Sequence, residues 1–299
     1  MRFLVTGVSG QIGGEAARRF TELGTVIPAA RGLFNLSQPT TLAGRLDALT
    51  PDVIINPAAY TAVDRAEDER ALAFTVNAES PGAIARWAAA RDVPLVHFST
   101  DYVFDGSGER PWREDDPAAP LSVYGASKLA GEENIRAAGG PHLIVRTSWI
   151  YAAGGNNFLR TIARLARERV ELTIVADQIG APTSAALVGD ILLQIVRKNL
   201  GGLDAAFAAA GNTLHVAADG HTSWHGFASA IIAGLRRLNV ALPVERIVPI
   251  ATKDYPTKAV RPLNSRLDLT RLRDSFGISP PPWDTLLEPE LDALTAPQL

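Results

Sequence analysis

The feature that most constrains this chain is a glycine-rich turn close to its N-terminus. The apolar, β-prone run Arg2 to Thr6 passes directly into GVSGQIGG (7–14), and a helical pattern follows. Gly7 permits a tight turn out of a strand, Gly10 lets a pyrophosphate approach the backbone, and Gly13 lets the helix pack closely on the sheet. Free N–H groups at the helix start attract phosphate. This order predicts a dinucleotide-binding unit, with a glycine turn that binds no ligand as the alternative.

Strand and helix patterns alternate along the first half of the chain at the lengths expected of βαβ units. The sequence therefore predicts an α/β fold with a Rossmann-like, doubly wound parallel sheet and right-handed crossovers. We predict strands at Arg2 to Thr6, Thr25 to Ala30, Val53 to Asn56, Leu95 to Ser99, Leu143 to Thr147 and Thr213 to Ala217. We predict helices at Ile12 to Leu23, Ala78 to Arg91, Asn157 to Glu168, Ser184 to Asn199 and Ser223 to Leu238.

The alternation weakens after residue 150, where prolines interrupt the chain more often. Residues 1–150 are predicted to form the dinucleotide-binding domain, which 183–218 rejoins. Residues 151–182 and 219–299 are predicted to build a smaller C-terminal α/β substrate lobe, with the ligand in the cleft between the two parts. The alanine-rich run Ala205 to Ala210 is interpreted as a surface loop or helix edge.

Composition excludes several classes of function. The 299 residues include no cysteine, so disulfides, thiolate chemistry and Cys-ligated metals are ruled out. A net charge of −3 gives no basic field for nucleic acid. No stretch is long enough to span a membrane, and the N-terminal apolar run is too short for a signal peptide, so we expect a cytoplasmic protein. His221 and His225 have metal-ligand spacing without a third ligand nearby, whereas His97 and Trp224 are interpreted as packing residues.

The candidate catalytic pair is Tyr124 and Lys128, which share one helix face because they are four residues apart. A nearby ammonium would lower the pKa of the phenol, which could then exchange a proton with a carbonyl oxygen while hydride moves at carbon. Ser99 and Thr100 end a predicted strand at the sheet edge where ligands bind, so a hydroxyl there could hold the carbonyl. The alternative is an ordinary helix face with a strand-end cap.

The end of the second strand bears on the choice of cofactor. NAD-binding proteins commonly carry an acidic residue there, which binds the 2′-hydroxyl. This chain has Ala29-Ala30-Arg31, with no carboxylate to repel a 2′-phosphate. We predict a preference for NADPH over NADH through Arg31. A solvated loop cation is the alternative.

Seven segments, recurring in order over nearly the whole chain, carry a resemblance to a known family. They are GVSGQIGGE (7–15), NPAAYTAVDRAE (56–67), FSTDYVFDG (98–106), YGASKLAGE (124–132), RTSWIY (146–151), DQIGAPTS (177–184) and RPLNSRLD (261–268). Together they resemble the dTDP-4-dehydrorhamnose reductase family of extended short-chain dehydrogenases/reductases. The combination is more specific than the glycine turn or the Tyr-Lys spacing alone.

The resemblance implies reduction of the C4 ketone of a dTDP-6-deoxy-4-ketosugar by NADPH or NADH. It implies a catalytic set of Thr100, Tyr124 and Lys128. It implies a cofactor site that includes Tyr124, Lys128, Gly7, Gly10, Gln11, Ile12, Asn35, Ala58, Ala59 and Tyr60, to which the argument from the second strand adds Arg31. It implies substrate contacts from Thr61, Val63, Thr100, Asp101, Trp149 and Arg261, with Asn264 a further candidate beside the diphosphate.

The chain departs from related sequences at two positions, and the resemblance also implies a metal. Related sugar-nucleotide dehydratases carry Thr-Asp-Glu where this chain has Thr100-Asp101-Tyr102, so reduction fits better than dehydration. Asn35 stands where relatives often have aspartate, which keeps an acceptor for adenine and removes the charge. Some family members are magnesium-dependent dimers, which implies Mg²⁺ and a homodimer; the matching carboxylates are Glu15, Asp190 and Asp292.

Two other functions stay open. The first is a reductase of another nucleotide-4-ketosugar, which product analysis would distinguish. The second is a non-catalytic NADP-binding regulatory subunit, against which the intact Thr100, Tyr124 and Lys128 argue.

Overall fold

The computed structural model describes residues 1–296, whose centre is a six-stranded sheet in the order β10-β5-β4-β3-β1-β2. All its strand pairs are parallel, so the predicted doubly wound sheet is confirmed. Its strands are β1 (Arg2–Thr6), β2 (Thr25–Ala29), β3 (Val53–Asn56), β4 (Leu95–Thr100), β5 (His142–Thr147) and β10 (Thr213–His215).

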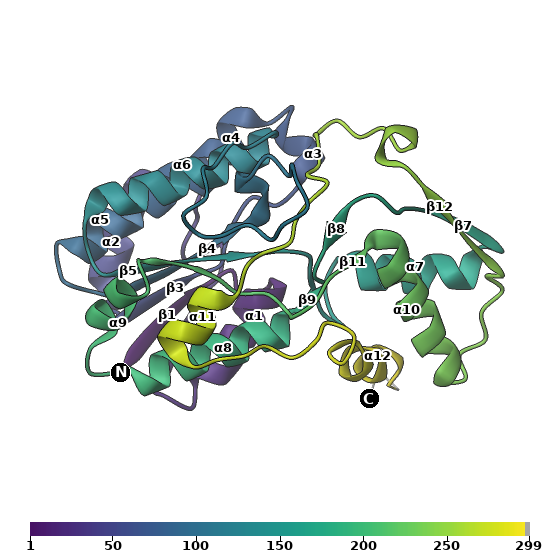
Figure 1. The fold of residues 1–299 in the computed structure, drawn as a ribbon. Coiled ribbons are helices and arrows are strands. Elements are labelled where there is room, and N and C mark those ends of the chain that lie inside the picture. The colour runs from purple at the N-terminus through teal and green to yellow at the C-terminus, as the bar shows by residue number, and fades with distance from the viewer. Residues whose placement is uncertain (297–299) are drawn as a thin grey trace.

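Helices cover both faces of this sheet (Figure 1). On one face lie α2 (Pro39–Leu49), α5 (Ser80–Ala89) and α6 (Val123–Ala138); on the other lie α1 (Gln11–Phe20), α8 (Ala185–Lys198), α9 (Leu203–Ala209) and α11 (Thr270–Phe276). Short elements complete the α6 side: α3 (Val63–Ala66), α4 (Arg70–Phe74) and a π-helical turn η1 (Thr75–Glu79).

Alternation along the strands assigns each side chain to one of two cores. Phe3 and Val5 of β1 pack toward α1 and α8, whereas Leu4 packs toward α2 and α5. Because successive side chains of a strand point to opposite faces, every second residue must be apolar on each buried side. The same alternation places the polar residues Thr6, Asn56 and His97 on the α6 face.

A second part of the chain packs beside the sheet around its own core, seen at the right of Figure 1. It holds α7 (Phe158–Glu168), α10 (Trp224–Arg237), α12 (Leu287–Thr295) and the parallel pair β7 (Glu171–Val175) and β12 (Arg246–Ile250). Short strand pairs join it to the sheet: β6 (Ile150–Tyr151) with β9 (Thr183–Ser184), and β8 (Ile179–Gly180) with β11 (Thr222–Ser223). Two 3₁₀ turns remain, η2 (Asp101–Val103) and η3 (Thr252–Asp254).

Several boundaries and elements differ from the prediction. The first helix ends at Phe20, three residues before the predicted end at Leu23, and residues 21–23 form a turn. Of the two alternatives for the run 205–210, the helix edge is observed and the surface loop is not: most of the run lies in α9, with Phe207 fully buried and residues 208 and 209 exposed. β7 and β12 were not predicted. Many of their residues are exposed or only partly buried, so neither strand has the continuous apolar run of a buried parallel strand. No helix within residues 1–296 has the length and apolarity needed to cross a membrane.

Candidate active site

The glycine turn has the geometry that a phosphate site requires. Gly7 has φ +58°, which favours glycine, and Gly10 N donates to its carbonyl at 2.8 Å. A Cβ on Gly13 would lie 2.1 Å from the Gly7 carbonyl oxygen, so only glycine lets α1 approach this closely. No side chain caps the start of α1 and its first turn has no acidic residue. The turn therefore leaves backbone N–H groups for an anion.

The loop after β3 is held by an asparagine that the sequence interpretation did not identify. Asn77 is buried in the π-helical turn η1; its Oδ1 accepts from Tyr60 N at 2.8 Å and its Nδ2 donates to Tyr60 O at 3.0 Å. Nδ2 also lies 2.9 Å from the Ser127 hydroxyl on α6. Asn77 thus fixes Tyr60, and the same loop adjoins the glycine turn, because a Cβ on Gly7 would lie 3.0 Å from Ala58 Cα. A π-helical turn inside a helix, common at functional sites, leaves little sequence signal.

Tyr124 lies in the first turn of α6, at the carboxyl end of β4. Ser122 caps the helix by accepting from Gly125 N at 3.2 Å. A Cβ on Gly125 would lie 2.2 Å from the Tyr102 carbonyl oxygen, so this glycine allows α6 to sit directly on η2. The Tyr124 ring meets Tyr102 edge to face at 5.5 Å. The predicted neighbours Thr100 and Tyr124 are therefore brought together.

Burial raises the pKa of Tyr124 above its ordinary value of 10, its hydrogen bond with Thr100 lowers it, and the Asp101 carboxylate raises it further. Asp101 is itself buried, which raises its pKa to about 6 although Ser265 and Thr100 donate to it. The expected lowering of the Tyr124 pKa by Lys128 is not found. At neutral pH the phenol keeps its proton, which is the state a proton donor needs.

Lys128 shares the helix face of Tyr124, as predicted, but its amine is turned to β4. Nζ donates to the Phe98 carbonyl at 2.5 Å and lies 3.2 Å from His97 Nε2. Burial lowers the pKa of Lys128 to about 8, while Glu132 one turn further along α6 raises it. His97 is fully buried, as predicted for a packing residue, but it also contacts Lys128, the predicted catalytic lysine.

A buried ion pair under the site was also not predicted. Glu132 is fully buried and accepts from Arg146 Nε at 2.9 Å and Nη2 at 2.7 Å. Arg146 comes from β5 and also donates to the Glu114 carbonyl at 3.0 Å. The pair locks α6 to the sheet two turns below Tyr124.

Trp149 follows β5 with φ +49°, an uncommon conformation for a residue other than glycine. Its indole stacks on Trp224 at 3.6 Å, and Trp224 Nε1 donates to Gln178 Oε1 at 3.1 Å. A Cβ on Gly180 would lie 2.5 Å from the Trp149 ring. Trp224 packs as predicted, and its partner is the tryptophan predicted to bind the sugar.

Arg261 reaches the site from the far end of the chain. Its Nη2 pairs with Asp64 Oδ2 at 2.7 Å and its Nη1 donates to the Tyr102 hydroxyl at 3.3 Å. Val63 is the first residue of α3, and Thr61 is exposed two residues before it. Both are therefore close in sequence to Asp64, the partner of Arg261. Arg261 is thus placed beside Tyr102 and, through it, Tyr124.

The remaining predicted residues lie further out. Arg31 is exposed beyond β2. Asn35 Oδ1 accepts from the backbone and hydroxyl of Ser37 at 3.0 and 2.9 Å. Gln11 Oε1 accepts from Asn157 Nδ2 at 2.9 Å, and Ile12 packs on the core. Asn264 is buried, and its amide holds the 107–110 loop and Arg266.

The predicted magnesium ligands are not supported. Glu15 and Asp190 lie on neighbouring helices, but both pair with the guanidinium of Arg19. That side chain balances their negative charge, so no metal ion is needed to do so. Asp292 is an exposed residue of α12. Among residues 1–296 no group of three or more potential carboxylate or histidine ligands is assembled.

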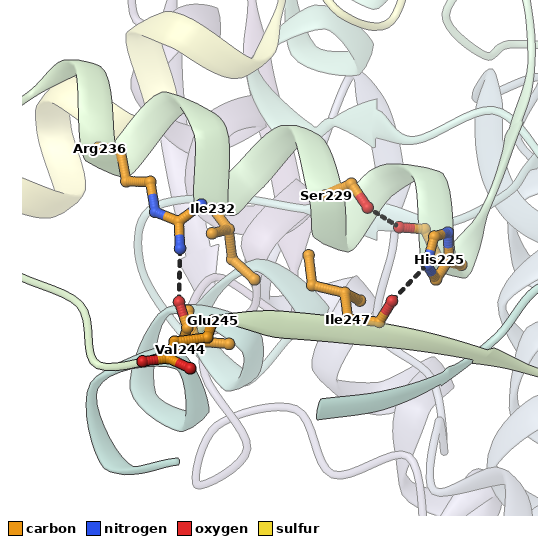
Figure 2. Close-up of a pocket in the computed structure, with 7 residues that line it drawn as sticks. All are labelled: His225, Ser229, Ile232, Arg236, Val244, Glu245 and Ile247. Carbon is orange, nitrogen blue, oxygen red and sulfur yellow. Dashed lines mark hydrogen bonds between the residues drawn. The ribbon is translucent and has the colours of Figure 1, made fainter. Parts of the chain in front are cut away.

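A cavity of about 230 Å³ lies between α10 and β12, away from Tyr124 (Figure 2). His225 Nε2 lies 3.1 Å from the Ile247 carbonyl, and Arg236 donates to the Val244 carbonyl at 2.5 Å. These contacts tie α10 to β12, so His225 has a structural partner and the cavity carries none of the predicted chemistry.

Comparisons with known proteins identify the family of this chain. The family model described as RmlD substrate binding domain matches residues 1–296. A dTDP-4-dehydrorhamnose reductase of Burkholderia thailandensis is 48% identical over 291 residues, 95% of each chain. A crystal structure of a dTDP-4-dehydrorhamnose reductase from Clostridium acetobutylicum is 33% identical with TM-score 0.89, covering 99% of this chain and 100% of that one. One from Bacillus anthracis, in complex with NADP, is 34% identical with TM-score 0.86 and covers 97% and 98%. The chain therefore belongs to the RmlD family, that of the dTDP-4-dehydrorhamnose reductases.

Proposed function

We propose that this chain reduces the C4 ketone of dTDP-4-dehydro-6-deoxy-L-mannose to dTDP-L-rhamnose, with Tyr124 as proton donor. The observation that carries the proposal is the placement of a protonated Tyr124 phenol beside Thr100 at the carboxyl end of β4. The glycine turn at the end of β1 opens at the same edge of the sheet. Relatives named for this activity, one of them solved with NADP, support the substrate class.

NADPH, when bound, supplies the hydride that reduces C4. The uncapped start of α1 and the Gly7–Gly13 turn would hold its phosphates. Thr100 and Tyr124 would bind the carbonyl oxygen, and the Tyr124 hydroxyl would give O4 its proton, so that a C=O bond becomes a CH–OH group. We also propose Trp149 with Trp224 as a wall for the sugar and Arg261 as a diphosphate contact.

The proposal favours reduction over water elimination for a structural reason. Dehydration needs an acid and a base on neighbouring carbons. Tyr102 takes the place of the second carboxylate, and it packs against Tyr124 and accepts from Arg261. Asp101 is then the lone carboxylate of that triplet.

A single assay tests the function. NADPH oxidation is measured with the dTDP-4-ketosugar made in situ, against the UDP and GDP analogues and against NADH, and NMR gives the C4 configuration of the product. We expect the dTDP substrate and NADPH to give the highest kcat/KM and a rhamno product. Equal rates with NADH would remove the proposed role of Arg31, and binding without turnover would favour a regulatory subunit.

The glycine turn gives a second prediction. Gly13→Ala is expected to weaken NADPH binding at least about tenfold, because its Cβ would meet the Gly7 carbonyl oxygen at 2.1 Å and push the turn outward. Gly14→Ala is the matched control, since its Cβ would lie at 3.4 Å from Val8 O, an ordinary contact. Titration of NADPH fluorescence measures both; equal affinities in the two variants would contradict the role of the turn.

A further inference from the structure

A row of buried polar side chains crosses the sheet beneath the active site. Thr6, Asn56 and His97 lie side by side on β1, β3 and β4 and are 1%, 0% and 0% exposed. Thr6 Oγ1 lies 2.7 Å from Asn56 Oδ1, Asn56 Nδ2 lies 3.0 Å from His97 Nδ1, and His97 Nε2 lies 3.2 Å from Lys128 Nζ. The row therefore links the residue before the glycine turn to the catalytic lysine.

A backbone group fixes the direction of these hydrogen bonds. Ala58 N–H donates to Thr6 Oγ1 at 3.2 Å, and a backbone N–H can only donate. The Thr6 hydroxyl accepts there and gives its own proton to Asn56 Oδ1. With the Asn56 amide reversed, the buried Thr6 proton would face an NH₂ group and lose its acceptor, which buried polar groups avoid.

This direction determines the state of the next two groups. Asn56 Nδ2 faces His97 Nδ1, which must accept, so a neutral imidazole carries its proton on Nε2. An Nε2–H that faces Lys128 requires a lone pair on Nζ, and the amine then gives its own hydrogen to the Phe98 carbonyl at 2.5 Å. The row is satisfied from end to end only when Lys128 is uncharged.

Electrostatics move both groups toward this state. Burial lowers the pKa of His97 well below its usual 6.5, so His97 is neutral, and burial lowers the pKa of Lys128 to about 8, so the uncharged amine predominates above pH 8. Two titratable groups act on the amine: His97 from β4, and Glu132 from the next turn of α6. Glu132 favours the charged amine, but Arg146 is bound to both its oxygens.

We propose that Thr6, Asn56 and His97 form a latch that holds the uncharged amine of Lys128 on the Phe98 carbonyl once Lys128 has lost its proton. Because a backbone amide closes its far end, the latch cannot pass a proton to solvent; it positions the amine and orients it. His97 is therefore a positioning residue that acts through Lys128. In the latched state no ammonium charge acts on Tyr124, so burial keeps the phenol protonated. Its catalytic meaning rests on the proposed function.

NMR tests the latch directly on the cofactor-free enzyme. The chain has lysines at 128, 198, 253 and 258 alone, so ¹³Cε labelling gives few signals, and Lys128→Arg assigns that of Lys128. Imidazole ¹⁵N shifts report the tautomer of His97, assigned with His97→Gln. We expect a Lys128 midpoint near pH 8 and, above that pH, a neutral His97 with its proton on Nε2.

Thr6→Val removes the hydroxyl that orients Asn56 without a change of shape or charge, two strands away from His97. We expect His97 to gain the Nδ1-protonated tautomer and the Lys128 midpoint to rise by about one pH unit, because a hydrogen bond to the neutral amine is lost. Thr147→Val is the matched control. Thr147 is also a buried strand-end threonine, but its hydroxyl has no partner within residues 1–296, so neither signal should change.

Two results would overturn the latch: a wild-type His97 protonated on Nδ1 above pH 8, or a folded Thr6→Val protein with wild-type signals. The first needs no variant, so the test holds even if Thr6→Val does not fold. Neither depends on turnover. An enzyme that fails to reduce the ketosugar but shows the Nε2 tautomer would refute the proposed function and leave the latch supported.

Discussion

Tyr124→Phe is expected to lower kcat for carbonyl reduction by about 10²- to 10⁴-fold, the range that a positioned proton donor contributes. NADPH binding should persist, because the ring and its contact with Tyr102 remain. The raised pKa keeps the wild-type phenol protonated throughout the neutral range, so the loss should be the same at pH 6 and pH 8. Single-turnover measurements of NADPH oxidation separate this chemical step from product release.

Tyr151→Phe is the matched control for that experiment. Tyr151 is fully buried in the second core, and its hydroxyl finds no hydrogen-bond partner in the described chain. Removing this hydroxyl should leave kcat at the wild-type value and stability unchanged or slightly higher. A Tyr124→Phe enzyme with wild-type turnover would remove Tyr124 from the catalytic set.

Glu132→Gln is expected to lower the free energy of unfolding by about 3–5 kcal/mol, the cost of leaving one member of a buried ion pair without its partner. Arg146 is 3% exposed and would keep its charge in the interior. Urea unfolding measures the loss. The control is Glu168→Gln, which removes the exposed partner of Arg164 and should cost at most about 0.5 kcal/mol.

The same ion pair predicts a pH dependence with a definite sign. Burial alone would raise the pKa of Glu132, but the hydrogen bonds and charge of Arg146 lower it from 4.5 to about 2. A carboxyl whose folded pKa is lowered stabilises the protein above its unfolded pKa and loses that effect as pH falls. The stability gap between wild type and Glu132→Gln should therefore shrink between pH 4.5 and 2. A gap that is constant over that range would contradict the assignment.

Local sequence pattern was sufficient for the glycine turn and for the Tyr124–Lys128 face. Both depend on neighbours within one turn of chain, where sterics and helix spacing fix the outcome. The helix pattern likewise placed α7, α8 and α10 within a residue or two of their observed bounds. Asn77 and Glu132 escaped notice because their partners, Tyr60 and Arg146, are remote in sequence.

The magnesium prediction failed for a related reason: it did not include a contact between residues that are remote in sequence. Glu15, Asp190 and Asp292 were grouped by resemblance, but an ion's place depends on every charge that reaches it. Arg19 lies one turn from Glu15 on α1, and only the packing of α1 on α8 brings Asp190 to the same guanidinium. A spacing pattern does not include that competing cation.

Sequence alone determined the fold class and the geometry of the N-terminal glycine turn, because both follow from interactions between residues that are close in the chain. Sequence also paired Tyr124 with Lys128. Only the tertiary structure decided their protonation. Burial raises the pKa of the phenol and lowers that of the amine, which donates to the Phe98 carbonyl and lies beside His97. Protonation depends on desolvation and on partners that meet only when the sheet is assembled.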